Sequence, residues 1–469
     1  MAPDDLCWLS ATELAARIRR KKASPVEVID AVLDRIDRVN PRLNAYVTVT
    51  ADEARRAARA AERAVMRRSA RLGPLHGVPF SVKDLVLTRD VRTTFGTLLF
   101  RDHVPTEDAP MVARLRAAGA IMVGKTNTPT FGWIGATHNL LFGATRNPWH
   151  PERTPGGSSG GASAAVAAGL GPLAIGTDGG GSIRIPASFT GIFGLKPSFG
   201  RVPTYPPSGT FLSHIGPMTR TVADAALMLQ VSAGPDDRDP YSLPAERMDY
   251  VRGLARRIRG LRVAYAGDLG FVQVVDPEIA AACAKAARVF RELGCRVDTV
   301  KPGWPSAREC WFEIFYGSVA VRLFPFRDRR DEIDPGLANI VDHVLANPPT
   351  KYAEAWAARL AWCQHPRTLF EKYDLLLTPT VACPAFGLGL DFPTEVAGRH
   401  VEPMMWTPFT FPFNLTGQPA ASVPCGFTKG GLPIGLQIVG RRFDDATVLR
   451  AAAAFERARP WTRARPPVA

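Results

Sequence analysis

Apolar residues near the N-terminus recur with a helical period. Within "ASPVEVIDAVLDRIDRVN", Val28, Val32 and Ile36 fall on one face of a helix. Ser24 is a candidate N-cap, and Glu27 completes a capping box with it. The pattern therefore predicts an amphipathic helix that begins directly after Ser24.

From Leu75 onward the pattern changes to short β-rich runs between glycines and prolines. The runs "GVPFSVKD", "AIMVGKT" and "GPLAIGTD" predict strands, while "APMVARLRAAG" and "GGASAAVAAG" between them predict helices. Further strands are predicted in "LRVAYAG", "DLLLTPT", "AASVPCG" and "PIGLQIVG", with a final helix in "DDATVLRAAAAFERA". This alternation indicates an α/β layer architecture.

No long linker, low-complexity tract or internal repeat interrupts the 469 residues. We therefore expect one domain over residues 1–469, because strands from both ends of a chain can join one sheet. Its parts are a helical segment (1–70), a glycine-rich core (71–235), a more helical and aromatic segment (236–373) and a C-terminal part of the same sheet (374–469).

Composition is that of a globular protein, with 46% hydrophobic and 22% charged residues. The net charge is +14, but lysines and arginines are spread along the chain and mixed with acidic residues, so we expect no nucleic-acid partner. The seven cysteines are scattered without a C-x-x-C pair, which argues against a disulfide framework, and we expect no metal and no cofactor. Because neither a signal peptide nor a membrane span is apparent, we expect a cytoplasmic protein without a membrane partner.

The stretch "TPGGSSGGAS" at 154–163 surrounds two serines with four glycines. It lacks the lysine that a P-loop needs. It does fit the pattern G-x-S-x-G, so a Ser-His α/β-hydrolase using Ser158 or Ser159 with His365 or His400 stays open as an alternative. A glycine-rich loop that only leads into a helix is the third interpretation.

A second glycine-rich stretch, "GTDGGGSIRIP", follows a predicted strand and contains Ser182 directly after its glycines. Successive glycines let backbone N–H groups point into one concavity, where they can stabilise the oxyanion that forms when a serine attacks a carbonyl. Ser182 is therefore a candidate nucleophile. No histidine lies in either motif, so its base must come from elsewhere.

Lys83 is a candidate base because it ends the apolar strand "GVPFSVK". A lysine buried at such a strand end can have its pKa lowered enough to act as a neutral base. The alternative is an ordinary lysine paired with the neighbouring Asp84.

Together, Lys83, "GGSSGG" and "GTDGGGSIRIPASFTGIFGLKPSFGRVP" closely resemble the amidase signature family of serine hydrolases. Ser158 and Ser182 are 24 residues apart, as the bridging and nucleophilic serines are in that family. The resemblance extends through "VGKTNTPTFGW", "IGPMTRTVADAALML", "FNLTGQPAASVPCG" and "PIGLQIVGRRFDDATVLRAAAAFE". It covers most of residues 75–230 and the last hundred residues.

The resemblance implies an acyl-enzyme mechanism in which Ser182 attacks an amide carbonyl and Ser158, after a cis peptide bond, relays its proton to neutral Lys83. It further implies an oxyanion hole formed by the backbone N–H groups of Gly179, Gly180, Gly181 and Ser182. Ser159 is expected to support the site, and Asp178 and Arg184 are expected to brace the loop. The implied fold is an α/β/α sandwich with a large twisted mixed sheet.

The family includes glutamine-hydrolysing amidotransferase subunits, fatty acid amide hydrolases and stand-alone bacterial amidases. This chain has "FLSHIGP", with Ser213 and His214, where the amidotransferase subunit usually has a run of the type "SSLDQIGP". Aromatic and apolar residues are expected around the substrate instead, which favours a hydrophobic or aryl amide for a bacterial-type amidase. The candidates for this pocket are Phe131, Trp133, Ile134, Trp311, Phe312, Phe315, Tyr316, Trp406, Phe409 and Phe411.

The expected partner is thus a small-molecule amide, and the N-terminal helices are a candidate surface for a homodimer. A glutamine-hydrolysing amidotransferase and a Ser-His esterase stay open as alternative enzymes. A catalytically silent paralogue stays open as a non-enzymatic role, although the presence of Lys83, Ser158 and Ser182 argues against it.

Overall fold

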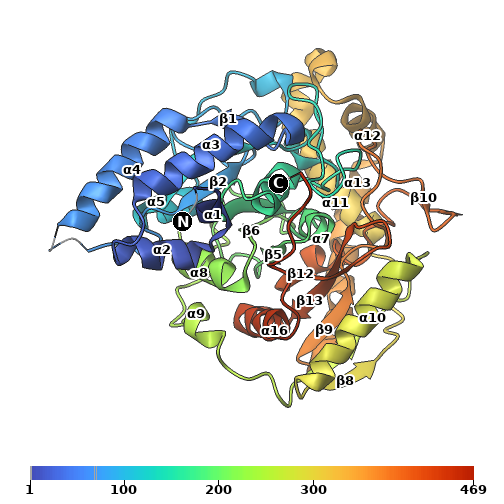
Figure 1. The fold of residues 1–469 in the computed structure, drawn as a ribbon. Helices are drawn as coiled ribbons and strands as arrows, with labels where there is room; N and C mark the ends of the chain where they lie inside the picture. The colour runs from blue at the N-terminus through green and yellow to red at the C-terminus, as the bar shows by residue number, and fades with distance from the viewer. Residues whose placement is uncertain (1–2, 68, 70, 469) are drawn as a thin grey trace.

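The computed structural model describes residues 3–67, 69 and 71–468. Its centre is an eleven-stranded mixed sheet with the strand order β1-β3-β2-β4-β6-β5-β12-β13-β9-β7-β8 (Figure 1). A separate hairpin pairs β10 (Glu395–Val396) with β11 (Arg399–His400). The sheet strands are β1 (Tyr46–Val49), β2 (Pro79–Lys83), β3 (Ile121–Thr126), β4 (Leu173–Asp178), β5 (Phe193–Lys196), β6 (His214–Thr219), β7 (Arg262–Tyr265), β8 (Arg296–Thr299), β9 (Leu375–Pro379), β12 (Ala420–Phe427) and β13 (Pro433–Gly440).

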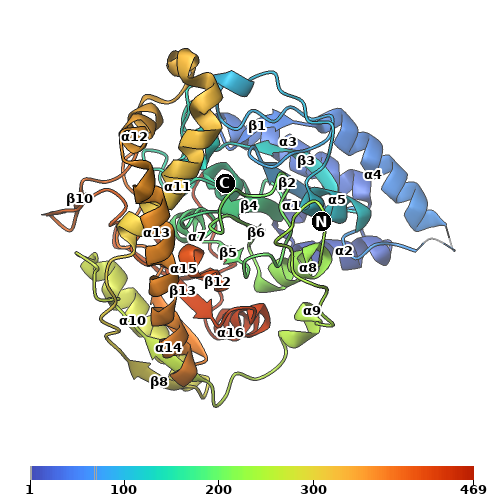
Figure 2. The same cartoon turned by 180° about the vertical axis from the view of Figure 1, so that it is seen from behind.

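Helices flank this sheet, and α11 to α14 form a long helical layer that is seen best from behind (Figure 2). Three short 3₁₀ helices are η1 (Leu98–Phe100), η2 (Thr130–Gly132) and η3 (Phe324–Glu332). The α-helices are α1 (Pro3–Trp8), α2 (Ala11–Arg19), α3 (Pro25–Leu43), α4 (Ala51–Met66), α5 (Pro110–Ala117), α6 (Gly160–Ala167), α7 (Arg184–Thr190), α8 (Val222–Ser232), α9 (Tyr250–Gly253), α10 (Pro277–Glu292), α11 (Arg308–Leu323), α12 (Pro335–Leu345), α13 (Pro349–Trp362), α14 (Gln364–Lys372), α15 (Pro412–Thr416) and α16 (Asp445–Ala458).

The predicted N-terminal helix is confirmed as α3, with both hydrogen bonds of its capping box. The backbone N–H of Ser24 donates to the Glu27 carboxylate over 3.0 Å, and Val26 N–H donates to Ser24 Oγ over 2.9 Å. The prediction of an all-helical segment 1–70 was wrong at β1, which pairs antiparallel with β3 at the sheet edge. β1 has only four residues between two long helices, too few for an alternation to be recognised.

Side chains of β9 show that both faces of the sheet are covered. Leu375 and Leu377 pack in a core with residues of α10 and α16, whereas Leu376 between them packs with residues of α11 to α14. Successive strand residues point to opposite faces, so this alternation requires a layer of helices on each side. The predicted α/β class, with helices around a large mixed sheet, is confirmed.

The sheet brings two predicted motifs to one edge. β2 and β4 are parallel neighbours, with Val82 opposite Ile175, so their carboxyl ends point the same way. Lys83 ends β2 and Asp178 ends β4, directly before the glycines that lead to Ser182. The topology therefore places the base candidate and the nucleophile loop side by side.

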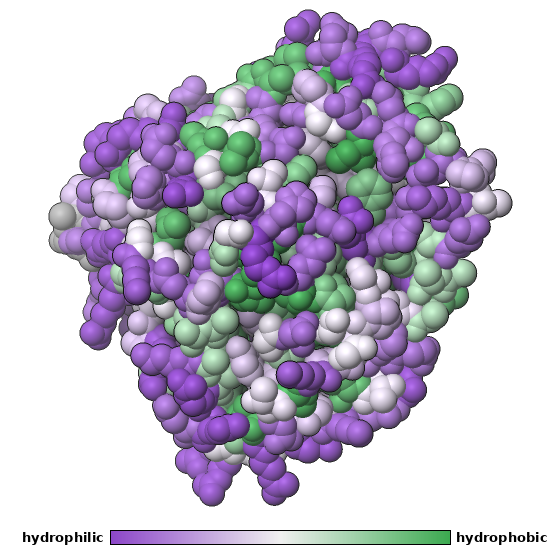
Figure 3. Space-filling view, turned by 90° about the vertical axis from the view of Figure 1, so that its right-hand side faces the viewer, coloured by the Kyte–Doolittle hydropathy of each residue, from purple (hydrophilic) through white to green (hydrophobic). Residues whose placement is uncertain are grey.

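The face shown in Figure 3 is mostly hydrophilic, with hydrophobic side chains in small groups. Such a surface is expected where exposed helices turn their apolar sides toward a sheet. Across the described residues, no helix is both long and apolar enough to cross a membrane.

Candidate active site

Lys83 lies at the centre of a buried polar cluster. Its Nζ is 2.6 Å from Ser158 Oγ, 2.9 Å from Ser159 Oγ and 2.8 Å from Thr177 Oγ1. The side chain is fully buried. Burial lowers the pKa of Lys83 well below its ordinary value, although the negative charge of Asp178 acts in the opposite direction. The amine is therefore far easier to deprotonate than a surface lysine.

The segment around Ser158 owes its glycines to close packing. A Cβ atom on Gly157 would lie 2.1 Å from the carbonyl oxygen of Ala136, so no larger residue fits there. The peptide bond between Gly157 and Ser158 is cis.

Ser159 is buried and joins the two glycine-rich segments. Its Oγ donates to the Thr177 carbonyl over 3.1 Å and accepts from Thr177 N–H over 3.2 Å. Its own N–H donates to the carbonyl of Ser182 over 3.2 Å. These bonds give Ser159 a place that fits the expected supporting role.

Asp178 shapes the loop that carries Ser182. Its two carboxylate oxygens accept from the N–H groups of Gly181 over 2.8 Å and Ile183 over 3.1 Å. The side chain of Ser182 is half-buried, whereas Lys83 behind it is closed to solvent. The loop thus presents the serine hydroxyl toward the space from which a substrate arrives.

This arrangement corrects one predicted oxyanion donor. The N–H of Gly181 already donates to Asp178, so it is not available in the same way as its neighbours. Within the described part of the chain, no acceptor is found for the N–H groups of Gly179, Gly180 or Ser182. These three remain the candidate donors.

Arg184 holds Asp178 from behind in a fully buried ion pair. Its Nε and Nη2 each lie 2.9 Å from a different oxygen of the carboxylate. Burial alone would raise the pKa of Asp178, but the charge and hydrogen bonds of Arg184 outweigh it and hold that pKa below its ordinary value. Asp178 is therefore ionised across the working range of pH.

Residues that sequence reasoning did not single out complete this cage. Arg184 also donates to Gln437 Oε1 over 2.7 Å and to Asn414 Oδ1 over 2.7 Å, and Thr410 donates to the Gly180 carbonyl over 2.7 Å. Asn414 and Gln437 stand in the motifs "FNLTGQPAASVPCG" and "PIGLQIVG", which carried the family resemblance. That membership was the only available signal, because nothing local indicates a contact with residue 184.

Two cavities meet at Ser182. The larger, of about 430 Å³, is lined by Ser158 and Ser182 and by the predicted residues Phe131 and Phe315. The smaller, of about 50 Å³, also reaches Ser182 but not Ser158. Its predicted lining residues are Trp133, Ile134, Trp311, Phe312, Phe315, Tyr316 and Trp406. The remaining candidates, Phe409 and Phe411, were wrong as pocket residues, because they are fully buried in the core and line neither cavity.

The histidines give little support to a Ser-His dyad. Neither His365, on α14, nor His400, on β11, lines either cavity. His214 does line the larger cavity, but its Nδ1 contacts the Leu212 carbonyl at 2.8 Å and its Nε2 lies 3.2 Å from Lys196 Nζ. Among the described residues, no histidine forms a hydrogen bond with Ser158, Ser159 or Ser182.

Comparison with known proteins agrees with this geometry. The family model described as Amidase matches residues 27–449. An acylamidase from Rhodococcus erythropolis is 42% identical over 473 residues, which cover 99% of this chain and 98% of the relative. A glutamyl-tRNA(Gln) amidotransferase subunit from Moorella thermoacetica is 39% identical over 493 residues, covering 98% of this chain and 99% of the relative.

Among solved structures, a bacterial aryl acylamidase of the amidase signature enzymes superposes with a TM-score of 0.91 at 36% identity, covering 97% of both chains. The match in sequence and the match in structure therefore both span nearly the whole chain. The chain belongs to the amidase signature family of hydrolases.

Proposed function

We propose that this protein, an amidase by family, is an acylamidase that cleaves linear amides through an acyl-enzyme on Ser182. Ser158 is the proton relay and Lys83 the base. The observation that carries the proposal is the buried contact of 2.6 Å between Lys83 Nζ and Ser158 Oγ, beside Ser182 and two cavities. The relatives named acylamidase and aryl acylamidase point to the same reaction class.

The hydrogen-bond valence around Lys83 supports a neutral amine. A neutral amine has two N–H donors and one lone pair, and Lys83 has three oxygen neighbours. Ser159 Oγ already donates to the Thr177 carbonyl, so it accepts from Lys83. With Thr177 Oγ1 accepting the second N–H, the lone pair is left for the hydroxyl proton of Ser158. Lys83 can then draw on that proton as a base.

The reaction follows from this arrangement. Ser182 Oγ bonds to the amide carbon as its proton moves to Ser158 and the Ser158 proton moves to Lys83. The N–H groups of Gly179, Gly180 and Ser182 stabilise the oxyanion. Collapse breaks the C–N bond as the amine nitrogen receives a proton from Ser158, which is resupplied by Lys83. Water then attacks the ester on Ser182 through the same relay and releases the carboxylic acid.

The relay also assigns the two cavities. The leaving nitrogen must meet the Ser158 hydroxyl, and Ser158 lines only the larger cavity. The amine part of the substrate therefore lies in the larger cavity, which has room for an aryl group. The acyl part occupies the smaller cavity of about 50 Å³, which suits a short chain.

A glutamine-hydrolysing role is less well supported, although one relative is an amidotransferase subunit. Glutamine would place its charged amino acid end on the acyl side, in a cavity lined mainly by aromatic and aliphatic side chains. The carboxylate there, Asp391, is already engaged by His138 at 2.9 Å. Burial of an unpaired ammonium beside those rings would be costly.

A fluorophosphonate labelling experiment tests the proposal. We expect one adduct on Ser182 in the wild type by intact mass and peptide mapping, no adduct in Ser182→Ala, and strongly slowed labelling in Lys83→Ala. An adduct on Ser158 or Ser159 that survives Lys83→Ala would overturn the proposal. Hydrolysis of acetanilide, followed by aniline release, is the accompanying activity assay.

A further inference from the structure

An arginine without a partner stands at the larger cavity. Arg322, near the end of α11, lines this cavity together with Ser158 and Ser182. Its guanidinium carbon lies 5.7 Å from the ring centroid of Phe131, another lining residue. Across the described part of the chain, no carboxylate pairs with Arg322 and no hydrogen-bond acceptor is found for it.

Nearby arginines behave differently. Arg329 is bonded to Glu332 through both carboxylate oxygens at 2.7 Å, and Arg330 forms an ion pair with Asp342. Surface arginines in this segment thus find acidic partners where these are within reach. Arg322 is the exception, and it is the one of the three that lines the catalytic cavity.

The cavity itself does not neutralise this charge. Its described lining contains no aspartate or glutamate. The titratable groups besides Arg322 are two histidines and Tyr205, and His103 Nδ1 is engaged with the Thr93 carbonyl at 3.0 Å. A guanidinium in an apolar pocket without a counter-ion favours an anionic ligand, and carboxylates fit its fork of donors.

Aromatic rings lie between this guanidinium and the serines. The ring centroid of Phe95 lies 5.3 Å from that of Phe100 and 5.9 Å from that of Phe131, and all three rings line the cavity. A flat aromatic group can pack against such a cluster. The pocket therefore combines a surface for a ring with a cation at its side.

We propose that Arg322 selects substrates whose amine part carries a carboxylate on an aromatic ring, that is, N-acylated aminobenzoates. This inference rests on the proposed function, because the relay through Ser158 places the amine part in this cavity. Hydrolysis would give a short carboxylic acid and an aminobenzoate. Arg322 acts here as a specificity residue and takes no part in proton transfer.

The expected effect is moderate, because Arg322 is exposed and its ion pair with a substrate is partly screened by water. We expect the wild type to favour 4-acetamidobenzoate or 3-acetamidobenzoate over the neutral 4-acetamidobenzamide by about three- to tenfold in kcat/KM. The preference should appear mainly in KM and should shrink as the salt concentration is raised from about 20 to about 500 mM.

The test compares wild type, Arg322→Gln and Arg327→Gln on the charged and neutral amides. Arg327 is a matched control, since it lies in the following 3₁₀ helix, stacks on Phe324 at 4.9 Å and lines neither cavity. We expect Arg322→Gln to abolish the preference, Arg322→Lys to restore part of it, and Arg327→Gln to keep it.

Other outcomes separate this inference from the proposed function. Hydrolysis of the neutral amide without a carboxylate preference, or a preference that survives Arg322→Gln, overturns the inference and leaves the acylamidase standing. A preference for succinanilate, whose carboxylate is on the acyl side, overturns it as well. Failure to cleave any of these amides, together with the absence of a Ser182 adduct, would instead overturn the proposed function.

Discussion

Asp178 and Arg184 form a two-pronged ion pair in which both carboxylate oxygens accept a hydrogen bond of 2.9 Å and neither side chain is exposed. The same two oxygens also hold the N–H groups of Gly181 and Ile183. The shape of the nucleophile loop therefore depends on a buried charge pair that does not itself touch Ser182 in the hydrogen bonds described.

Removal of one member of this pair should be worse than removal of both. We expect Arg184→Met to lower the free energy of unfolding by about 3 to 5 kcal/mol, because it leaves the buried Asp178 carboxylate uncompensated. Asp178→Asn/Arg184→Met should be less destabilised than Arg184→Met alone. Urea unfolding of the three proteins measures this, and simple additivity of the two changes would contradict it.

Lys83 should leave a signature in the pH dependence of stability. Its pKa is lowered in the folded state, so the unfolded chain binds more protons between that pKa and about 10.4. Stability should rise with pH across this window, with a slope of up to about 1.4 kcal/mol per pH unit. Lys83→Met should lose the slope and be relatively more stable at neutral pH. An unchanged slope would mean that Lys83 is charged in the fold.

Gly181 should tolerate no side chain. Its φ is +135°, and a Cβ there would lie 2.5 Å from Thr410 Oγ1. We expect Gly181→Ala to displace the loop and lower kcat by about 100-fold or more, by analogy with the loss of an oxyanion donor. Gly253→Ala is the control, since a Cβ at that helical position meets nothing within 4 Å. Full activity of Gly181→Ala would show that the loop adapts.

The cavity assignment predicts a crossed change in selectivity. Ile134 lines only the smaller cavity and Leu87 only the larger one. Ile134→Ala should raise kcat/KM for butyranilide relative to acetanilide, whereas Leu87→Ala should alter the preference among substituted anilides and leave the acyl preference as it is. The reverse pattern would exchange the acyl and amine sides.

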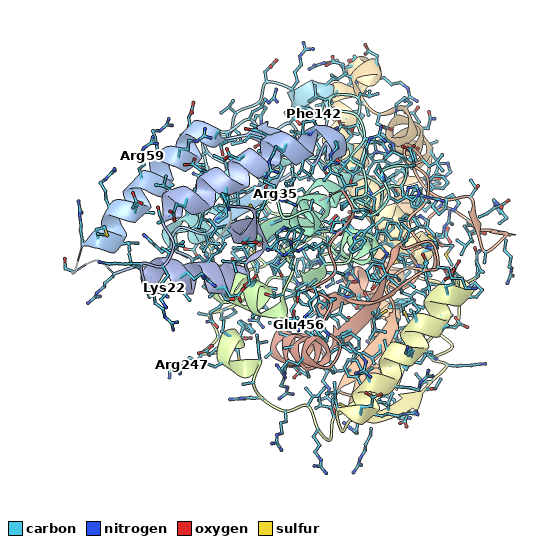
Figure 4. The ribbon with its side chains drawn as sticks, viewed as in Figure 1. Lys22, Arg35, Arg59, Phe142, Arg247 and Glu456 are labelled. Carbon is cyan, nitrogen blue, oxygen red and sulfur yellow. The ribbon has the colours of Figure 1, made fainter. Side chains whose placement is uncertain are left out.

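Glu456 on α16 should weaken the fold as pH rises. It lies close to α8 (Figure 4), and both its carboxylate oxygens accept from Val222 N–H over 3.3 Å. Burial raises its pKa to about 7, so its contribution to stability is present below about 4.5 and lost as pH rises through 7. Glu456→Gln should be more stable than wild type at pH 8 by about 2 kcal/mol, whereas Glu354→Gln, on an exposed side chain, should change little.

Local patterns predicted much of the fold and part of the site. Periodicity and turn residues predicted α3, α16 and the strands that end in Lys83 and Asp178. They could not predict the strand order or β1, because pairing partners lie far apart in the chain and four residues carry too little pattern. The resemblance supplied Ser158 and Ser182 as partners of Lys83. Neither source indicated that Gly181 N–H is taken by Asp178, or that Arg322 stands at the cavity without a counter-ion.

The cage around Arg184 has a consequence for synthesis of the protein. Its acceptors on Asn414 and Gln437 lie 230 and 253 residues further along the chain. A nascent chain that has already emerged past Ser182 therefore lacks the groups that fix its nucleophile loop. The serine stays unassembled until nearly the entire polypeptide has left the ribosome, so fragments truncated before β13 cannot carry a competent hydrolase into the cell.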